Sequence, residues 1–98
     1  MKIIDSNEFE EILSSGKKFV IDFYANWCGP CRALSPILEE ISSEIDIYKV
    51  NVDESSDLAR EYGIMSIPCL ILFDKGSEQK KIIGLKDKET LLDWIKTK

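Results

Sequence analysis

The feature that most constrains the fold is the segment FVIDFYA at residues 19–25, which is largely apolar on both alternating faces apart from Asp22. Successive side chains of a strand point to opposite sides, so a strand with two apolar faces has to be covered on both. This is the pattern of a central strand in an α/β sheet. We therefore predict a strand here, with helices packed above and below it.

Helical and extended patterns alternate along the rest of the chain. Ahead of the central strand, Asp5 and Ser6 are possible N-caps of an amphipathic helix that ends before Gly16. Glu8 completes a capping box if Asp5 is the cap. After the strand, apolar residues at the 3.6-residue helical period predict a long helix, which Pro36 kinks by removing a backbone hydrogen bond. These apolar residues are Leu34, Ile37, Leu38, Ile41 and Ile45.

The C-terminal half predicts one more parallel strand and then a hairpin. The segment IDIYKVNVD at 45–53 is rich in β-formers and follows the central strand at the spacing of a parallel βαβ crossover. A short helix ends at Gly63, and the segments CLILFD at 69–74 and EQKKIIG at 78–84 then pair as an antiparallel hairpin. Asp87 caps a final helix. This order predicts a mixed sheet with helices on both faces.

Composition and charge exclude several classes of function. At 98 residues and 44% hydrophobic content the chain can bury one core, so we expect a single domain over residues 1–98. Its 13 Lys and Arg against 18 Asp and Glu give a net charge of -5, which makes nucleic acids and anionic membrane surfaces poor partners. Neither a signal peptide nor a membrane-spanning apolar run is visible, so we expect a cytoplasmic protein.

The segment WCGPC at 27–31 places Cys28 and Cys31 at the junction between the central strand and the long helix. Unpaired backbone N–H groups and the positive end of the helix dipole point at the Cys28 sulfur there and favour its thiolate. Gly29 permits the tight turn, and Pro30 suits the first helical turn because its missing N–H has no partner there. With Cys31 one turn further on, the two sulfurs can form a disulfide or open to two thiols. The spacing therefore predicts redox exchange, with Cys28 as the nucleophile and Cys31 as the resolver.

Metal binding is the alternative for this pair of cysteines. A structural zinc site needs four ligands, but the chain has no histidine and only one further thiol, Cys69. An iron–sulfur cluster bridged between two chains would need thiolates from a partner, and the sequence shows no sign of one. We therefore expect redox chemistry without a bound metal or cofactor.

The WCGPC segment, preceded by VIDFYA and followed by a helix that contains a proline, resembles the active-site segment of the thioredoxin family. The likeness continues through KVNVD at 49–53, YGIMSIP at 62–68 and Gly84, and it covers nearly the whole chain. It implies the thioredoxin-like three-layer α/β fold. That fold has a central mixed five-stranded sheet, with three parallel strands and an antiparallel C-terminal hairpin, flanked by four helices.

The resemblance also implies an activity and its partners. A member of this family is a general protein-disulfide reductase, an electron carrier that acts on disulfide-containing client proteins. A thioredoxin reductase, either a flavoprotein or a ferredoxin-linked enzyme, keeps it reduced. We expect such a protein to work as a monomer without a bound cofactor.

Asp22 and Lys49 are the candidates for the proton transfer that frees Cys31 to attack. Asp22 interrupts an apolar strand, and burial without a full partner raises the pKa of a carboxyl group. A hydrogen-bonded or strand-end aspartate with no catalytic part is the alternative. The resemblance implies a proton-relay role for Asp22, directly or through water, tuned by Lys49 on the neighbouring strand. Lys49 shares the alternating face of Ile47, which turns it inward, whereas an ordinary surface lysine is the alternative.

Four residues are candidates for client binding: Trp27, Ile67, Pro68 and Gly84. Trp27 lies beside Cys28, where we expect a partly exposed apolar contact, with a core aromatic as the alternative. The resemblance implies a cis Ile67–Pro68 bond that faces the cysteines and leaves backbone groups of Ile67 free to pair with an extended peptide. Gly84 extends the apolar rim of this surface or has an ordinary role in a turn.

Cys69 departs from the family pattern, because threonine is common after the proline. We expect a small buried hydrophobe, and a third reactive thiol close to the active pair is the alternative.

The leading function is the reduction of protein disulfides by dithiol–disulfide exchange through Cys28 and Cys31. A rival from another class is a thioredoxin-like binding or chaperone subunit in which the dithiol is incidental.

Overall fold

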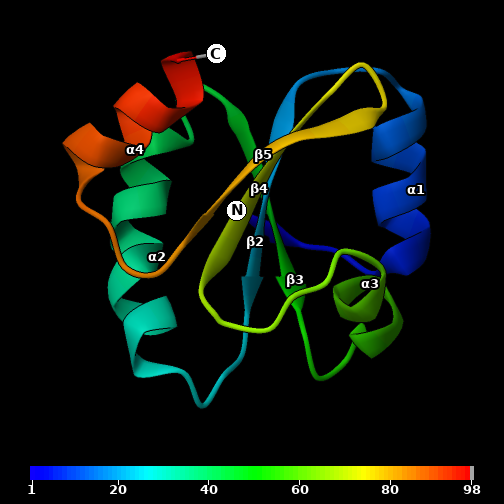
Figure 1. The fold of residues 1–98 in the computed structure, drawn as a ribbon, viewed down its shortest axis with the longest axis horizontal. Helices are drawn as coiled ribbons and strands as arrows, with labels where there is room; N and C mark the ends of the chain where they lie inside the picture. The colour runs from blue at the N-terminus through cyan, green and yellow to red at the C-terminus, as the bar shows by residue number, and fades with distance from the viewer. Residues whose placement is uncertain (98) are drawn as a thin grey trace.

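The computed structural model describes residues 1–97, and its strands form one five-stranded sheet in the order β1-β3-β2-β4-β5 (Figure 1). The strands are β1 (Lys2–Ile3), β2 (Phe19–Tyr24), β3 (Asp46–Asn51), β4 (Cys69–Asp74) and β5 (Ser77–Ile83). The helices are α1 (Ser6–Ser14), α2 (Gly29–Ile41), α3 (Ser56–Glu61) and α4 (Lys88–Lys96). β1, β3 and β2 are parallel, whereas β4 runs antiparallel to β2 and β5 antiparallel to β4. The predicted three-layer α/β fold is confirmed.

The helices divide between the two faces of the sheet (Figure 1). α1 and α3 lie on one side, and α2 and α4 lie on the other. The buried members of the first core cluster are Ile4, Phe9, Phe19, Ile21, Phe23, Val50, Leu58, Cys69, Ile71 and Phe73. Those of the second are Val20, Leu34, Leu38, Ile41, Ile47, Leu70, Leu72 and Leu91. Alternate residues of β2 and β4 feed the two clusters, as the period of a strand requires.

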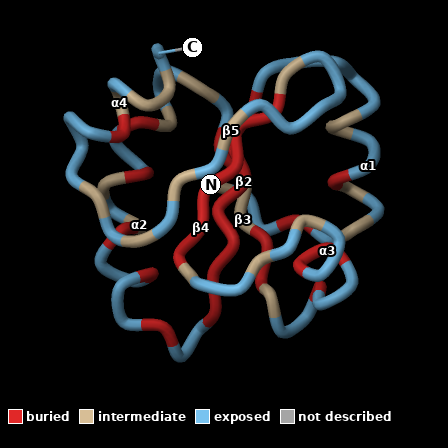
Figure 2. Tube along the Cα trace, in the orientation of Figure 1, coloured by how far each residue is buried: buried red, intermediate tan, exposed pale blue. Residues whose placement is uncertain are grey.

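β2 is buried at every position, which confirms that it is the central strand (Figure 2). β5, by contrast, is exposed or half-buried throughout because it lies at one edge of the sheet. Its polar residues face solvent and protect the free edge from pairing with other chains. Because β2 and β3 are parallel, their C-terminal ends lie at the same end of the sheet.

The capping box of α1 is present as predicted. The Asp5 carboxylate accepts the backbone N–H of Glu8 at 2.8 Å, and the Glu8 carboxylate accepts the N–H of Asp5 at 3.2 Å. Gly16 follows the helix with a φ of +76°, a conformation that costs glycine little because it has no Cβ. Both ends of α1 are therefore determined locally by the sequence.

The predicted extent of α2 is wrong at its C-terminal end. The helix contains Pro36 but ends at Ile41, with Ser42 as its C-cap, so Ile45 lies in the turn before β3. Ile45 still packs against the cluster beneath α2, which explains why it continued the apolar period. The hydroxyl of Ser42 donates to the carbonyl of Glu39 at 2.6 Å, a local bond that competes with continued helix.

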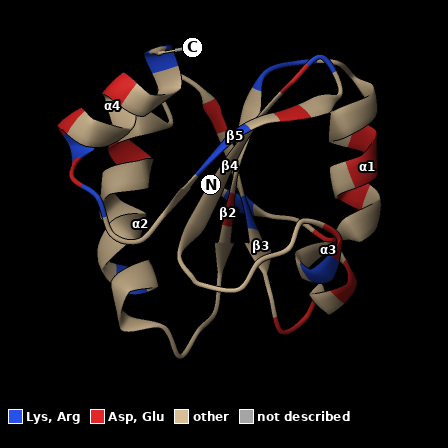
Figure 3. Cartoon of the chain, viewed as in Figure 1, with Lys and Arg blue, Asp and Glu red and all other residues tan. Residues whose placement is uncertain are grey.

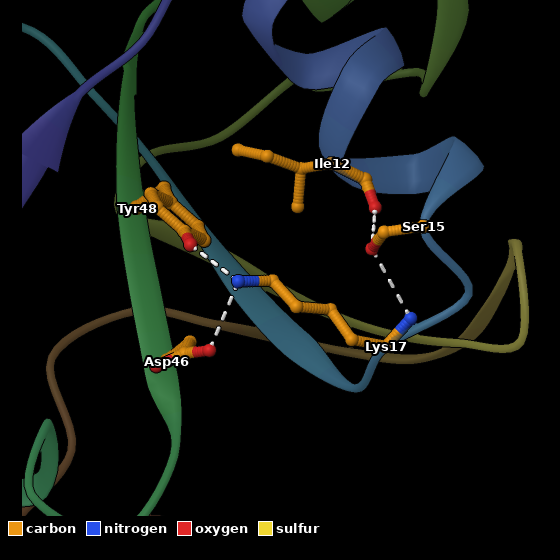
Figure 4. A network of polar contacts seen from close by, with 5 residues as sticks. All are labelled: Ile12, Ser15, Lys17, Asp46 and Tyr48. Carbon is orange, nitrogen blue, oxygen red and sulfur yellow. Dashed lines mark hydrogen bonds and ion pairs between the residues drawn. The ribbon is translucent and has the colours of Figure 1, made fainter.

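A polar network joins the end of α1 to the start of β3 (Figure 4). The Lys17 ammonium donates to Asp46 Oδ2 at 3.0 Å and to the Tyr48 hydroxyl at 2.7 Å. The backbone N–H of Lys17 donates to Ser15 Oγ, whose hydroxyl donates to the carbonyl of Ile12. These contacts are largely exposed, so we expect them to position the chain where it enters β2 more than to add stability.

Among residues 1–97, the structure contains no helix with the length and apolar character that a bilayer crossing requires.

Candidate active site

Cys28 and Cys31 form a disulfide where β2 passes into α2, and their Cα atoms are 5.3 Å apart. Cys28 is the N-cap of α2, and its Sγ accepts the backbone N–H of Cys31 at 3.2 Å. Pro30 stands in the first turn of the helix, where a missing N–H costs nothing. The sulfur of Cys28 is thus held against an N–H donor and the positive end of the helix dipole.

Hydrogen bonds hold the loop between β2 and α2 at both of its ends. The backbone N–H of Cys28 donates to the carbonyl of Ala25 at 3.2 Å, closing a turn directly after β2. The guanidinium of Arg32 donates to the carbonyl of Asn26 at 2.7 Å and fixes the loop to the first turn of α2. Arg32 is the first charged side chain after the strand, so the loop itself is uncharged (Figure 3). This contact could not be predicted, because it depends on the loop conformation.

Both sulfur-bearing residues are largely buried in the disulfide form. Cys28 exposes 5% of its surface and Cys31 exposes 3%. They pack with Tyr24 and Ala25 in a small cluster of their own, against which Val52 and Ile67 also pack. Cys28 is thus slightly more exposed than Cys31, which lies in the first turn of α2.

Asp22 is 1% exposed in the middle of β2. Within residues 1–97, neither of its carboxylate oxygens has a hydrogen-bond partner. Burial raises the pKa of Asp22 to about 7, and the charge of Lys49 opposes this rise in part. The carboxyl group is therefore poised to gain or lose a proton near neutral pH. No protein group among residues 1–97 therefore supplies the hydrogen bond that the alternative of a structural aspartate would require.

Lys49 is the register partner of Asp22 across the β2–β3 pair. It is half-buried, and its ammonium lies 4.3 Å from the ring centroid of Tyr24 in a cation–π contact. Lys49, Tyr24 and Cys31 line the same cleft, whose volume is about 210 Å³. The inward orientation expected for Lys49 is confirmed, and the cleft brings its charge to the helix turn that carries Cys31.

Trp27 is 69% exposed, so the expected exposure of its side chain is confirmed and the core aromatic is excluded. Its indole Nε1–H donates to Asp53 Oδ2 at 2.9 Å. Asp53 was missed as a site residue, although its position carries a signal. Trp27 and Asp53 both follow the C-terminal ends of neighbouring parallel strands, and such ends meet at one edge of the sheet.

Ile67, Pro68 and Gly84 lie together at the start of β4. The Ile67–Pro68 bond is cis, as expected, and Ile67 packs against the cysteine cluster. The N–H of Gly84 donates to the carbonyl of Pro68 at 2.8 Å, and Gly84 has a φ of +96° that favours glycine. Pro68 itself is buried. Met65, which is 95% exposed on the same segment, gave no recognisable signal in the sequence.

Cys69 is 1% exposed and belongs to the core cluster on the α1 and α3 side of the sheet. Burial raises the pKa of its thiol. The sheet separates Cys69 from α2 and therefore from the disulfide at the start of that helix. The expected buried position of Cys69 in the core is confirmed.

Comparisons with known proteins agree over nearly the whole chain. The family model described as Thioredoxin matches residues 1–97. A thioredoxin from Chlamydia pneumoniae is 48% identical over 98 residues, covering 97% of this chain and 95% of that protein. A bifunctional thioredoxin reductase/thioredoxin from Mycobacterium leprae is 43% identical over 96 residues, covering 94% of this chain and 21% of that protein. The solved structure of mitochondrial thioredoxin 3 from Saccharomyces cerevisiae, in its oxidized form, has a TM-score of 0.89 and 34% identity, covering 98% of this chain and 93% of that one.

Proposed function

The chain belongs to the thioredoxin family and is a thiol–disulfide oxidoreductase that reduces protein disulfides, and we propose that Cys28 is its attacking thiol and Cys31 its resolving thiol. The observation that carries this assignment is the hydrogen bond from the Cys31 N–H to the Cys28 sulfur at the start of α2. An N–H donor and a helix N-terminus stabilise the anion at Cys28, and a thiolate is the reactive form of a cysteine.

The reaction proceeds in two exchanges that together move two electrons. The Cys28 thiolate attacks one sulfur of a client disulfide, and the other client sulfur leaves as a thiolate. Cys31 then loses its proton and attacks Cys28 Sγ. The second client sulfur leaves as a thiolate, and the client thiolates take up protons. The products are the reduced client and the Cys28–Cys31 disulfide.

Asp22 accepts the proton of Cys31 in the second exchange. A base with a pKa close to the working pH combines availability with driving force, and the pKa of about 7 at Asp22 meets that requirement. The positive charge of Lys49 favours the ionised carboxylate and keeps this pKa from rising further. Cys31 and Lys49 line one cleft, and Lys49 is the register partner of Asp22, which supports a relay through water between Cys31 and Asp22.

Clients bind to the surface around Cys28 formed by Trp27, Ile67 and Gly84, and the buried Pro68 supports this surface through the hydrogen bond from the Gly84 N–H to its carbonyl. The exposure of Trp27 and the packing of Ile67 on the cysteine cluster support this assignment. Backbone groups beside Pro68 can pair with an extended peptide, which gives affinity without demanding a particular sequence. Broad specificity toward disulfide-containing proteins follows from such contacts.

A thioredoxin reductase, a flavoprotein or a ferredoxin-linked enzyme, supplies the electrons. The relative from Mycobacterium leprae, whose name joins a thioredoxin reductase to a thioredoxin, supports this partner. We further propose that residues 1–98 act as a single monomeric domain in the cytoplasm.

The test is steady-state reduction of insulin with dithiothreitol as the electron donor. We expect Cys28→Ser to lose turnover completely, because no other exposed thiol can form the first mixed disulfide. Cys69→Ala removes the third thiol of the chain and is the matched control, for which we expect turnover at the wild-type rate. Turnover that survives Cys28→Ser would contradict the assignment of Cys28 as the attacking thiol. It would favour the rival function, a thioredoxin-like binding or chaperone subunit in which the dithiol is incidental.

A further inference from the structure

The turn after β3 is built by the side chain of Asn51, a residue to which the reaction assigns no role. Asn51 is 4% exposed, and its Oδ1 accepts the backbone N–H groups of Asp53 at 2.9 Å and Glu54 at 3.2 Å. A side-chain oxygen that accepts the N–H two residues on forms an Asx turn, which fixes the backbone of the residues between. The position of Asp53 therefore depends on the amide of Asn51.

Asp53 in turn holds the exposed indole of Trp27 beside Cys28. Its Oδ2 accepts the Trp27 Nε1–H at 2.9 Å, although Asp53 itself is exposed. Ordering an exposed residue costs both backbone and side-chain entropy, and the turn already meets the backbone part of that cost for Asp53. A continuous path thus runs from the buried amide of Asn51 through Asp53 to the indole.

We propose that Asn51 is a positioning residue for client binding, which acts by holding Asp53 and thereby orienting Trp27 against the client that Cys28 attacks. This inference rests on the proposed function, because it concerns the client surface of the same site. A fixed aromatic side chain binds a protein with less loss of entropy than a mobile one. The contribution of Asn51 therefore belongs to the binding of protein clients and not to the exchange chemistry.

The backbone of this segment has other supports that do not need the amide. The N–H of Val52 donates to the carbonyl of Tyr24 at 2.9 Å, and the N–H of Ser55 donates to the carbonyl of Asn51 at 2.8 Å. Asp53 and Glu54 are exposed, so water can satisfy their N–H groups after the amide is removed. We therefore expect Asn51→Ala to fold with the strand pairing intact and to loosen only the turn.

The experiment measures kcat and KM of Asn51→Ala for two substrates, insulin and the small hydrophilic bis(2-hydroxyethyl) disulfide. For insulin we expect KM to rise about threefold to tenfold at unchanged kcat, the range that corresponds to the loss of one hydrogen bond. For the small disulfide, which is too small to need a fixed indole, we expect both constants to match those of the wild type. Asn7→Ala, at an exposed position of α1, is the matched control and should change neither substrate.

Two further variants separate positioning from loss of structure. Asn51→Asp keeps an acceptor oxygen and should restore the wild-type KM for insulin. Asp53→Ala should raise that KM by the same factor as Asn51→Ala, and the double variant should raise it no further, because the two residues act through one path. If the alanine variant at position 51 does not fold, Asn51→Leu, which keeps a side chain of similar size without an acceptor oxygen, takes its place.

The NMR resonance of the Trp27 indole N–H reports the hydrogen bond to Asp53 independently of any measurement of activity. We expect this resonance to move toward the position of a free indole in Asn51→Ala and to stay in place in Asn7→Ala. The variant Trp94→Phe assigns the resonance, since Trp94 is the other tryptophan of the chain. The inference would be overturned by an unmoved resonance or an unchanged KM for insulin in Asn51→Ala. It would also be overturned by an equal loss of activity toward both substrates, or by additive effects on KM in the double variant. Failure of the wild type itself to reduce insulin would instead overturn the proposed function.

Discussion

In reduced Cys31→Ser we expect the first exchange to proceed and the second to stop, so that the protein accumulates in a covalent complex with its client. The hydroxyl of serine cannot displace a thiolate from the Cys28 sulfur, so the mixed disulfide loses its intramolecular route to resolution. When reduced protein is mixed with insulin in the absence of dithiothreitol, single-turnover release of reduced client should be lost, while up to one equivalent of client is captured per protein. Non-reducing electrophoresis and mass spectrometry of the captured species measure both results.

The cysteine that carries the trapped client decides the assignment. Cys28 is the expected site, since its sulfur faces the N-terminus of α2, whereas Cys69 is buried on the other face of the sheet. The double variant Cys31→Ser with Cys69→Ala should trap the client to the same extent. A complex through Cys69, or no complex at all, would show that the order of attack is not the one proposed.

Asp22→Asn should have the second large effect, and it should appear in stability as well as in rate. A carboxyl group whose pKa is raised by folding binds its proton more tightly in the native state than in the unfolded chain. Between the ordinary aspartate pKa of 3.8 and the folded pKa of about 7, the native state therefore holds more protons, so stability falls as pH rises through this window. The full effect at alkaline pH is about 4 kcal/mol for this shift, an upper limit for one group.

The free energy of unfolding of the oxidised protein, measured from pH 4 to pH 9 against the same series for Asp22→Asn, isolates this contribution. We expect the wild type to lose up to about 4 kcal/mol relative to the variant across the window, since asparagine carries no charge to desolvate. Glu44→Gln removes an exposed carboxylate and is the matched control, for which the two series should run parallel. Parallel series for Asp22→Asn would mean that the carboxyl group does not titrate in this range.

The same variant tests the proton transfer to Asp22. Loss of a positioned base commonly slows a step by about 10²-fold to 10⁴-fold, and here the slowed step is the attack of Cys31 on the mixed disulfide. We expect the wild-type rate of this step to rise with pH around 7 and the rate of Asp22→Asn to lose that rise. Rapid-mixing measurements of client release report this step directly. An unchanged rate with an unchanged pH profile would leave Asp22 as a buried residue without a part in the reaction.

Much of the fold follows from local signals in the sequence. The capping box of Asp5 and Glu8, the apolar segment that became β2, and the cap at Asp87 each fix an element through contacts within a few residues. The end of α2 could not be predicted, because Ile45 packs on the same cluster as the helix while lying beyond it. A periodic pattern reports the buried face but not the backbone conformation that delivers each residue to it.

The reactive cysteines of the site could also be predicted from the sequence, whereas the residues that position the loop around them could not. The spacing of Cys28 and Cys31 indicated the dithiol, and the lone acid in β2 indicated the carboxyl group that we propose as the base. Asp53 and Asn51 join the site through a turn that brings β3 beside the β2–α2 loop, and this contact exists only after the strands pair. Contacts that depend on sheet register leave little trace in a single sequence.

The alkylation rate of Cys28 in the reduced protein, followed with iodoacetamide as a function of pH, tests the central claim most directly. That claim is that the N-terminus of α2 stabilises the Cys28 thiolate, although this residue exposes 5% of its surface in the disulfide form. We expect Cys28 to be alkylated at neutral pH ahead of Cys31 and Cys69, with a pKa below the value of about 8.5 for a free cysteine. A pKa at or above that value, or a Cys28 that does not react at neutral pH, would contradict it.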